Sequence, residues 1–154
     1  MKNRTNRTLT FALMLLIAAV TIAAGQEDRN SDHIVGTWNV TVTFVDCTTG
    51  AVIRSFPTLN TFNVGGTMME TPRSLAQRSP GQGVWDKIGG NEYSSVFKFF
   101  RSNADGTDNG YQLVRRQHLV DGDTITTTAT FQNYNASGQP TTTGCAVESA
   151  TRLF

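Results

Sequence analysis

Apolar and polar residues alternate with a period of two through most of this chain, and this pattern constrains the fold more than any other feature. Every second residue from Trp38 to Phe44 is apolar, and the residues between them are threonines and an asparagine. The run 124–134 repeats the pattern, with Ile125, Thr127, Ala129 and Phe131 on one face. Such alternation is typical of strands with one buried face. Between residues 34 and 154 no helical periodicity is long enough for a substantial helix, so an all-β fold is predicted.

Glycine-rich and Asp-Gly turns divide this region into eight expected strands. Their approximate ranges are 34–45, 51–62, 67–71, 83–88, 92–101, 111–120, 124–134 and 141–153. Pro57 predicts that the second strand is edge-like or bent, because proline cannot donate a ladder hydrogen bond. The connections are short, which favours an antiparallel up-and-down arrangement that either stays open or closes on itself.

The two cysteines favour closure. In an eight-stranded antiparallel barrel the end of the first strand lies beside the start of the last, and Cys47 and Cys145 stand at those two places. We therefore expect a disulfide across the closing seam; the alternative is two unpaired thiols. Two cysteines with no histidine near them in sequence are too few ligands for a metal site, and no cofactor is expected.

Loop length alternates along the expected barrel. The connections after strands two, four and six have about three or four residues, whereas the others have about five to eleven. One end is therefore expected to be tightly closed, and the other to carry long loops around a mouth. Barrels of this size either hold one small ligand or are filled by their own side chains.

The N-terminal residues predict export. Lys2, Arg4 and Arg7 precede an apolar run that ends in small residues before Gln26, which is the layout of a secretory signal peptide. The sequence thus divides into a signal peptide at 1–25, a flexible lead-in at 26–33 and a barrel domain at 34–154. The rival interpretation is an uncleaved membrane anchor. With cleavage we expect a secreted or periplasmic protein without stable membrane insertion.

The charge of the mature part argues against polyanionic partners. Ten basic and twelve acidic residues follow residue 25, a formal net charge of −2, and no large cluster of lysine and arginine is present. Nucleic acids and anionic membranes attract basic patches, so neither is an expected partner.

A tripeptide near one end of the barrel domain and an arginine near the other suggest a family. Gly36-Thr37-Trp38 opens the first strand, and Arg152 stands in the last. This resembles the Gly-x-Trp signature of lipocalins, in which a late arginine packs across the tryptophan at the closed end of the barrel. The chain lacks a recognisable helix before its last strand and a Thr-Asp-Tyr motif between strands six and seven, so it is described as lipocalin-like or calycin-like. In shape it also resembles barrels of the allene oxide cyclase-like and dirigent-like kinds.

Aromatic and apolar residues in the strand halves near the long loops are the expected ligand-binding residues, because small-molecule pockets are mostly apolar with a few polar anchors. The predicted set is Phe44, Met68, Trp85, Phe99, Tyr111, Leu113, Arg115 and Phe131. The alternative for each of them is an ordinary packed core. Strand phase alone does not decide between Phe99 and Phe100.

The sixth strand carries polar side chains on both faces, in Arg115, Arg116, Gln117 and His118. At least one is expected to point into the barrel, where an arginine needs an acidic partner such as Glu70, Glu92 or Glu148 and would anchor a ligand carboxylate. The alternative is a solvated face or an internal salt bridge.

No catalytic signature stands out, and no catalytic residue is assigned. The only histidines are His33 and His118, which makes a histidine dyad or a multi-histidine metal site difficult to assemble. The expected function is binding of a small, largely apolar molecule. The alternatives are an isomerase or cyclase that uses Glu70, Arg115 or His118, and a filled barrel that acts only through its surface.

Overall fold

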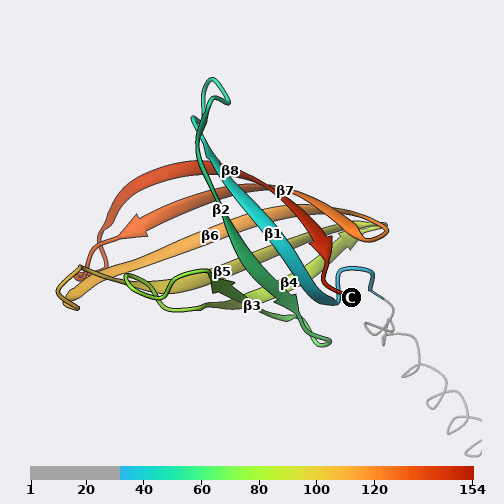
Figure 1. The fold of residues 1–154 in the computed structure, drawn as a ribbon, viewed down its shortest axis with the longest axis horizontal. Helices are drawn as coiled ribbons and strands as arrows, with labels where there is room; N and C mark the ends of the chain where they lie inside the picture. The colour runs from blue at the N-terminus through green and yellow to red at the C-terminus, as the bar shows by residue number, and fades with distance from the viewer. Residues whose placement is uncertain (1–31) are drawn as a thin grey trace, which may run out of the picture. The chain divides into compact units, whose positions relative to one another are not determined.

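The computed structural model describes residues 32–154, which form an all-β structure with eight strands and no helix (Figure 1). The strands are β1 (Gly36–Val45), β2 (Val52–Phe62), β3 (Thr67–Pro72), β4 (Gly81–Gly89), β5 (Glu92–Ser102), β6 (Asp108–Asp121), β7 (Thr124–Tyr134) and β8 (Pro140–Arg152). They form a closed antiparallel up-and-down barrel in chain order. The predicted lipocalin-like architecture is therefore confirmed. The predicted signal peptide at 1–25 and residues 26–31 of the lead-in lie outside the described residues.

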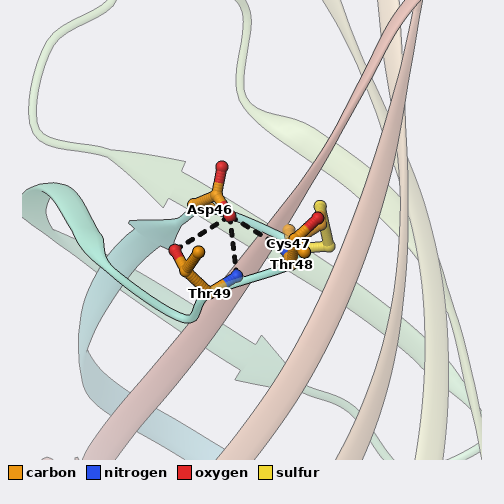
Figure 2. The surroundings of a disulfide bond; sticks show 5 residues. Asp46, Cys47, Thr48 and Thr49 are labelled. Carbon is orange, nitrogen blue, oxygen red and sulfur yellow. Dashed lines mark hydrogen bonds between the residues drawn. A yellow bond between two sulfur atoms is a disulfide. The ribbon is translucent and has the colours of Figure 1, made fainter.

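The first and last strands close the barrel. β1 pairs with β8 from Trp38 opposite Arg152 to Val45 opposite Cys145. Two residues beyond Val45, Cys47 forms the predicted disulfide with Cys145, and their Cα atoms lie 5.3 Å apart (Figure 2). The covalent bond thus joins the two strands at the long-loop end of their shared seam.

The turn between β1 and β2 is ordered by one carboxylate beside the disulfide. Oδ1 of Asp46 accepts hydrogen bonds from the backbone N–H groups of Thr48 and Thr49 and from the Thr49 hydroxyl, at 3.0, 2.7 and 2.9 Å (Figure 2). These bonds, above all that from the Thr49 backbone, lower the pKa of Asp46. The turn therefore holds Cys47 in place for its partner.

Trp38 and Arg152 close the end of the barrel that carries the short loops. The Trp38 ring is fully buried and donates through Nε1 to the Ile34 carbonyl at 2.9 Å. The Arg152 guanidinium lies 4.2 Å from the centre of that ring and donates to the backbone carbonyls of Val35 and His33 at 2.9 and 2.7 Å. The arginine therefore ties the chain segment before β1 to the last strand.

Gly36 leaves room for that arginine. Its φ is +134°, a conformation that other residues rarely adopt, and a Cβ atom at this position would lie 2.7 Å from Arg152 Nη1. The glycine of the Gly-x-Trp tripeptide is thus explained by both backbone conformation and space.

A packed core fills the same half of the barrel. Phe62, Trp85 and Tyr93 are buried there and meet edge to face. His118 lies among them, with its ring 5.3 Å from that of Phe62. Its two ring nitrogens are hydrogen-bonded to the hydroxyls of Ser95 and Thr127, each at 2.8 Å. This half of the barrel is therefore solid.

The sheet is incomplete beside β2. β3 is short and pairs only with the second half of β2, from Thr58 to Phe62, so the first half is paired with β1 alone. Pro57 lies at this boundary, which agrees with the predicted edge-like strand. The segment 73–80 crosses to β5 instead, where Ser79 N–H donates to the Phe100 carbonyl and Ser102 N–H to the Gln77 carbonyl, both at 3.0 Å. The wall of the barrel is thus completed by a loop at this end.

Candidate ligand site

A cavity of about 980 Å³ occupies the half of the barrel next to the long loops. Residues from the loops after β3 and β5 line it, together with inward-facing side chains from the mouth-side halves of the strands. None of the aromatic residues of the closed half borders it. The barrel therefore has a solid end and a hollow end, and the mouth is where the loop lengths predict it.

Apolar side chains on the strands form one part of the cavity wall. The apolar lining residues on β1, β2, β5, β6, β7 and β8 include Val42, Phe44, Phe56, Phe97, Phe99, Val114, Ala129, Phe131 and Ala146. The Phe44 ring packs against those of Phe56 and Phe131, with centroids 5.3 and 5.0 Å apart. A Cβ atom on Gly144 would lie 2.2 Å from the Phe131 ring, so the missing side chain at this position leaves room for the ring.

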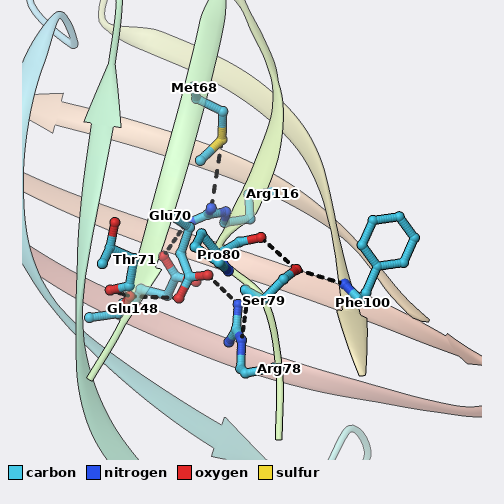
Figure 3. Close-up of polar contacts among 10 residues, drawn as sticks. Met68, Glu70, Thr71, Arg78, Ser79, Pro80, Phe100, Arg116 and Glu148 are labelled. Carbon is cyan, nitrogen blue, oxygen red and sulfur yellow. Dashed lines mark hydrogen bonds and ion pairs between the residues drawn. The ribbon is translucent and has the colours of Figure 1, made fainter. Parts of the chain in front are cut away.

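A buried ion pair lies at the floor of the cavity. Arg116 on β6 donates through Nη1 to Glu148 Oε2 on β8 at 2.9 Å, and the two side chains are 1% and 5% exposed (Figure 3). With its amide turned so that the oxygen faces the guanidinium, Asn60 accepts a hydrogen bond from the same Nη1 at 2.6 Å. Met68 Sδ lies 3.7 Å from Nη2. The guanidinium also lies 4.2 Å from the centre of the Phe97 ring. Its Nε is buried with no hydrogen-bond partner among the described residues.

A second ion pair lies beside the first. Arg78, from the loop after β3, pairs with Glu70 on β3 (Figure 3). The Thr58 hydroxyl donates to Glu70 Oε1 at 2.6 Å. The guanidinium of Arg78 stacks on the Phe99 ring at 3.5 Å. Burial lowers the pKa of Arg78; Glu70 opposes this effect, and the positive charge of Arg116 adds to it. The two guanidinium groups thus influence each other electrostatically across the floor.

Three more arginines surround the mouth. Arg54 on β2 and Arg101 on β5 belong to the inward-facing series of their strands, and Arg73 follows β3. The Arg54 guanidinium lies 4.8 Å from the centre of the Phe44 ring. We call Arg54, Arg73 and Arg101 the mouth arginines.

Three residues of the predicted ligand set line the cavity: Phe44, Phe99 and Phe131. Phe99 is buried, whereas Phe100 is 60% exposed, which settles the phase of β5. Met68 is buried and meets Arg116 at the floor but is not part of the lining.

The other predicted residues lie elsewhere. Tyr111, Leu113 and Arg115 are on the outer face of β6, whose inner face carries Gln112, Val114, Arg116 and His118. Apolar side chains stand on both faces of this strand, with Val114 and Val120 inside and Leu113 and Leu119 outside, so hydrophobicity does not reveal its phase. An error of one residue moves every side chain to the other face. Arg116, paired with Glu148, is the inward arginine.

Trp85 belongs to the closed half. It is buried, and its Nε1 donates to the Asn63 carbonyl at 3.0 Å, in the short turn after β2. The strand begins at Gly81, two residues before the predicted start, so Trp85 lies further from the mouth than its place in the predicted strand implies.

Sequence reasoning missed Phe56 and Phe97 in the walls and Arg54, Arg73, Arg78 and Arg101 around them. Period-two alternation could have predicted part of this set. Phe97, Phe99 and Arg101 stand at alternate positions of β5 and therefore share a face, and the same holds for Arg54, Phe56 and Thr58 of β2. For Arg73 and Arg78 no periodic signal exists, since both lie in the irregular segment after β3.

His118, one of the residues considered for proton transfer, does not border the cavity. Burial, with a further contribution from the charge of Arg116, lowers its pKa to about 3. The ring is therefore neutral at physiological pH and serves the packing of the closed half. In residues 32–154 no group of three or more His, Cys, Asp or Glu side chains is arranged to hold a metal ion.

Comparison with known proteins adds no relative: no family model, curated protein or solved structure matches the chain. Among residues 32–154 there is no helix long and apolar enough to cross a membrane.

Proposed function

We propose that this protein binds a small, largely apolar molecule in the open half of its barrel. The observation that carries the proposal is the cavity of about 980 Å³, which lies within the usual size range of ligand pockets. Five phenylalanines contribute to its walls, and two ion pairs lie at its floor. An apolar body with a small number of polar groups is the kind of ligand that matches this distribution.

Binding is better supported than isomerase or cyclase activity. Of the three residues considered for proton transfer, Arg115 is on the outer face and His118 lies outside the cavity. Only Glu70 lines it, and this carboxylate is already engaged by Arg78 and Thr58. A turnover assay on a lipid epoxide tests the alternative: a Glu70→Gln variant that loses rate but keeps affinity would support catalysis.

A fluorescence titration with a neutral apolar probe, N-phenylnaphthylamine, tests the binding proposal. We expect emission to rise and saturate with the natural protein. Gln112→Trp places a large ring at the mouth and should weaken binding, whereas Leu113→Trp, one residue along on the outer face, should not. Thermal unfolding of both variants shows whether they remain folded. Absence of saturable binding, or equal losses in two folded variants, would refute the proposal.

We also propose that the protein is exported to an oxidising compartment. The Cys47–Cys145 disulfide supports this proposal, because such bonds persist outside the reducing cytosol. N-terminal sequencing of the protein recovered from the extracytoplasmic fraction tests it, with cleavage near Gly25 as the expected result.

A further inference from the structure

The charges of this domain are distributed unevenly between the cavity and the rest of its surface. Residues 32–154 contain nine lysines and arginines against ten aspartates and glutamates. Five of those basic residues line the cavity, all of them arginines, but only two of the acidic residues do. The cavity thus has a formal excess of three positive charges, whereas the remainder of the domain is acidic.

The charges at the floor cancel. Arg116 pairs with Glu148, and Arg78 pairs with Glu70, so each cation at the floor has a carboxylate within ion-pair distance. The positive excess therefore resides on the mouth arginines. None of these three forms a salt bridge within the described part of the chain.

The acidic residues near the mouth are engaged in their own turns. Asp46 accepts hydrogen bonds from Thr48 and Thr49 in the β1–β2 turn. Asp105 accepts from the backbone and hydroxyl of Thr107, at 3.0 and 2.6 Å. Asp108 accepts from Gly110 N–H at 2.7 Å. None of these aspartates lines the cavity or forms a salt bridge with a mouth arginine.

We propose that the ligand is an anionic amphiphile, whose carboxylate or similar oxyanion lies among the mouth arginines while its apolar body lies against the phenylalanines below. Guanidinium groups are suited to this task, because their planar donors match a carboxylate and they are weakly hydrated. The Arg54 guanidinium lies over the Phe44 ring, so a charged group and an apolar wall residue of the proposed site are in contact.

This inference rests on the proposed binding function and narrows it to one ligand class. A matched set of ten-carbon probes tests it: decanoate, decanol and decyltrimethylammonium, each used below its critical micelle concentration to displace N-phenylnaphthylamine at mildly alkaline pH. We expect decanoate to bind tightest and the cationic probe weakest. The preference for decanoate over decanol should shrink as salt is added, because exposed charges are screened.

Variants locate the anion site. Changing Arg54, Arg73 and Arg101 to glutamine should weaken decanoate binding about threefold per residue and leave decanol binding unchanged. Arg115→Gln is the matched control, because it removes an arginine from the outer face, and it should change neither affinity.

The outcomes separate the two proposals. If decanol binds and decanoate binds no tighter, the anionic ligand class is wrong but the binding function stands. If neutral and anionic probes all fail to bind, the binding function itself is wrong. Sedimentation with phosphatidylglycerol vesicles distinguishes a lipid surface from a dissolved ligand. The inference would be overturned if the protein bound these vesicles through the mouth arginines but did not bind dissolved decanoate.

Discussion

Acidification should destabilise this protein through one buried histidine. His118 is enclosed between Ser95, Thr127 and the Phe62 ring, and burial lowers its pKa to about 3 from an ordinary value of 6.5. Below about pH 6.5 the unfolded chain binds a proton at this residue and the folded protein does not. Stability is therefore present above that pH and is lost as the pH falls toward the folded pKa.

The size of the effect follows from the two pKa values. Each pH unit in this window shifts the free energy of unfolding by about 1.4 kcal/mol for one proton, so acidification from about pH 7 to about pH 4 should cost about 3 kcal/mol. The pKa values of Asp46 and Asp105 are lowered from 3.8, so the loss of those carboxylate charges in the folded state falls below this window. Of these three groups, His118 is therefore the one expected to change stability between about pH 6.5 and about pH 4.

Urea unfolding at a series of pH values measures the effect. His118→Gln keeps a hydrogen-bonding side chain but cannot titrate, so its stability should vary much less between those pH values. His33→Gln, which removes the exposed histidine, is the control and should retain the natural slope. Should His118→Gln fail to fold, an NMR titration of the His118 ring in the natural protein gives its pKa directly. Equal slopes in all three proteins, or a His118 pKa near 6.5, would refute the reasoning.

Three further changes test other parts of the barrel by urea unfolding. Arg116→Met should cost about 3 to 5 kcal/mol because it leaves Glu148 buried without its partner, and adding Glu148→Leu should recover part of that loss; strictly additive effects would contradict the coupling. Replacing Cys47 and Cys145 together by alanine should cost about 4 kcal/mol, because the bond closes a loop with a sequence separation of 98, and an unchanged midpoint would contradict this. Gly36→Ala should cost about 1 to 3 kcal/mol through its unfavourable φ and its collision with the guanidinium that it faces, and a cost near zero would contradict that explanation.

The fold was predictable because several independent signals agreed. Alternation from Trp38 to Phe44 gave the phase of β1, turn glycines gave the strand count, and Cys47 with Cys145 indicated which strands close the barrel. Each signal is local or concerns one pair of residues, so each is readable without coordinates.

The site was predictable only in part, because it depends on strand phase and on an irregular segment. β6 carries a charged pair, Arg115 and Arg116, at successive positions, and only the surrounding barrel decides which of them is inside. The stabilising partner Glu148 lies on β8, far away in sequence, and Arg78 comes from a loop without periodicity. Charges buried inside a barrel contradict the hydrophobic pattern by which an inner face is recognised.

The pairing of β1 with β8 also bears on how the molecule forms. Partners such as Trp38 and Arg152 are separated by almost the entire described chain, so the cylinder cannot be completed until the last strand has been synthesised. Such distant contacts slow folding, because a long loop must be ordered before they form. Until then we expect an open sheet in which β1 and the growing end of the sheet are unpaired edge strands. The disulfide is expected to form only after β1 and β8 have paired.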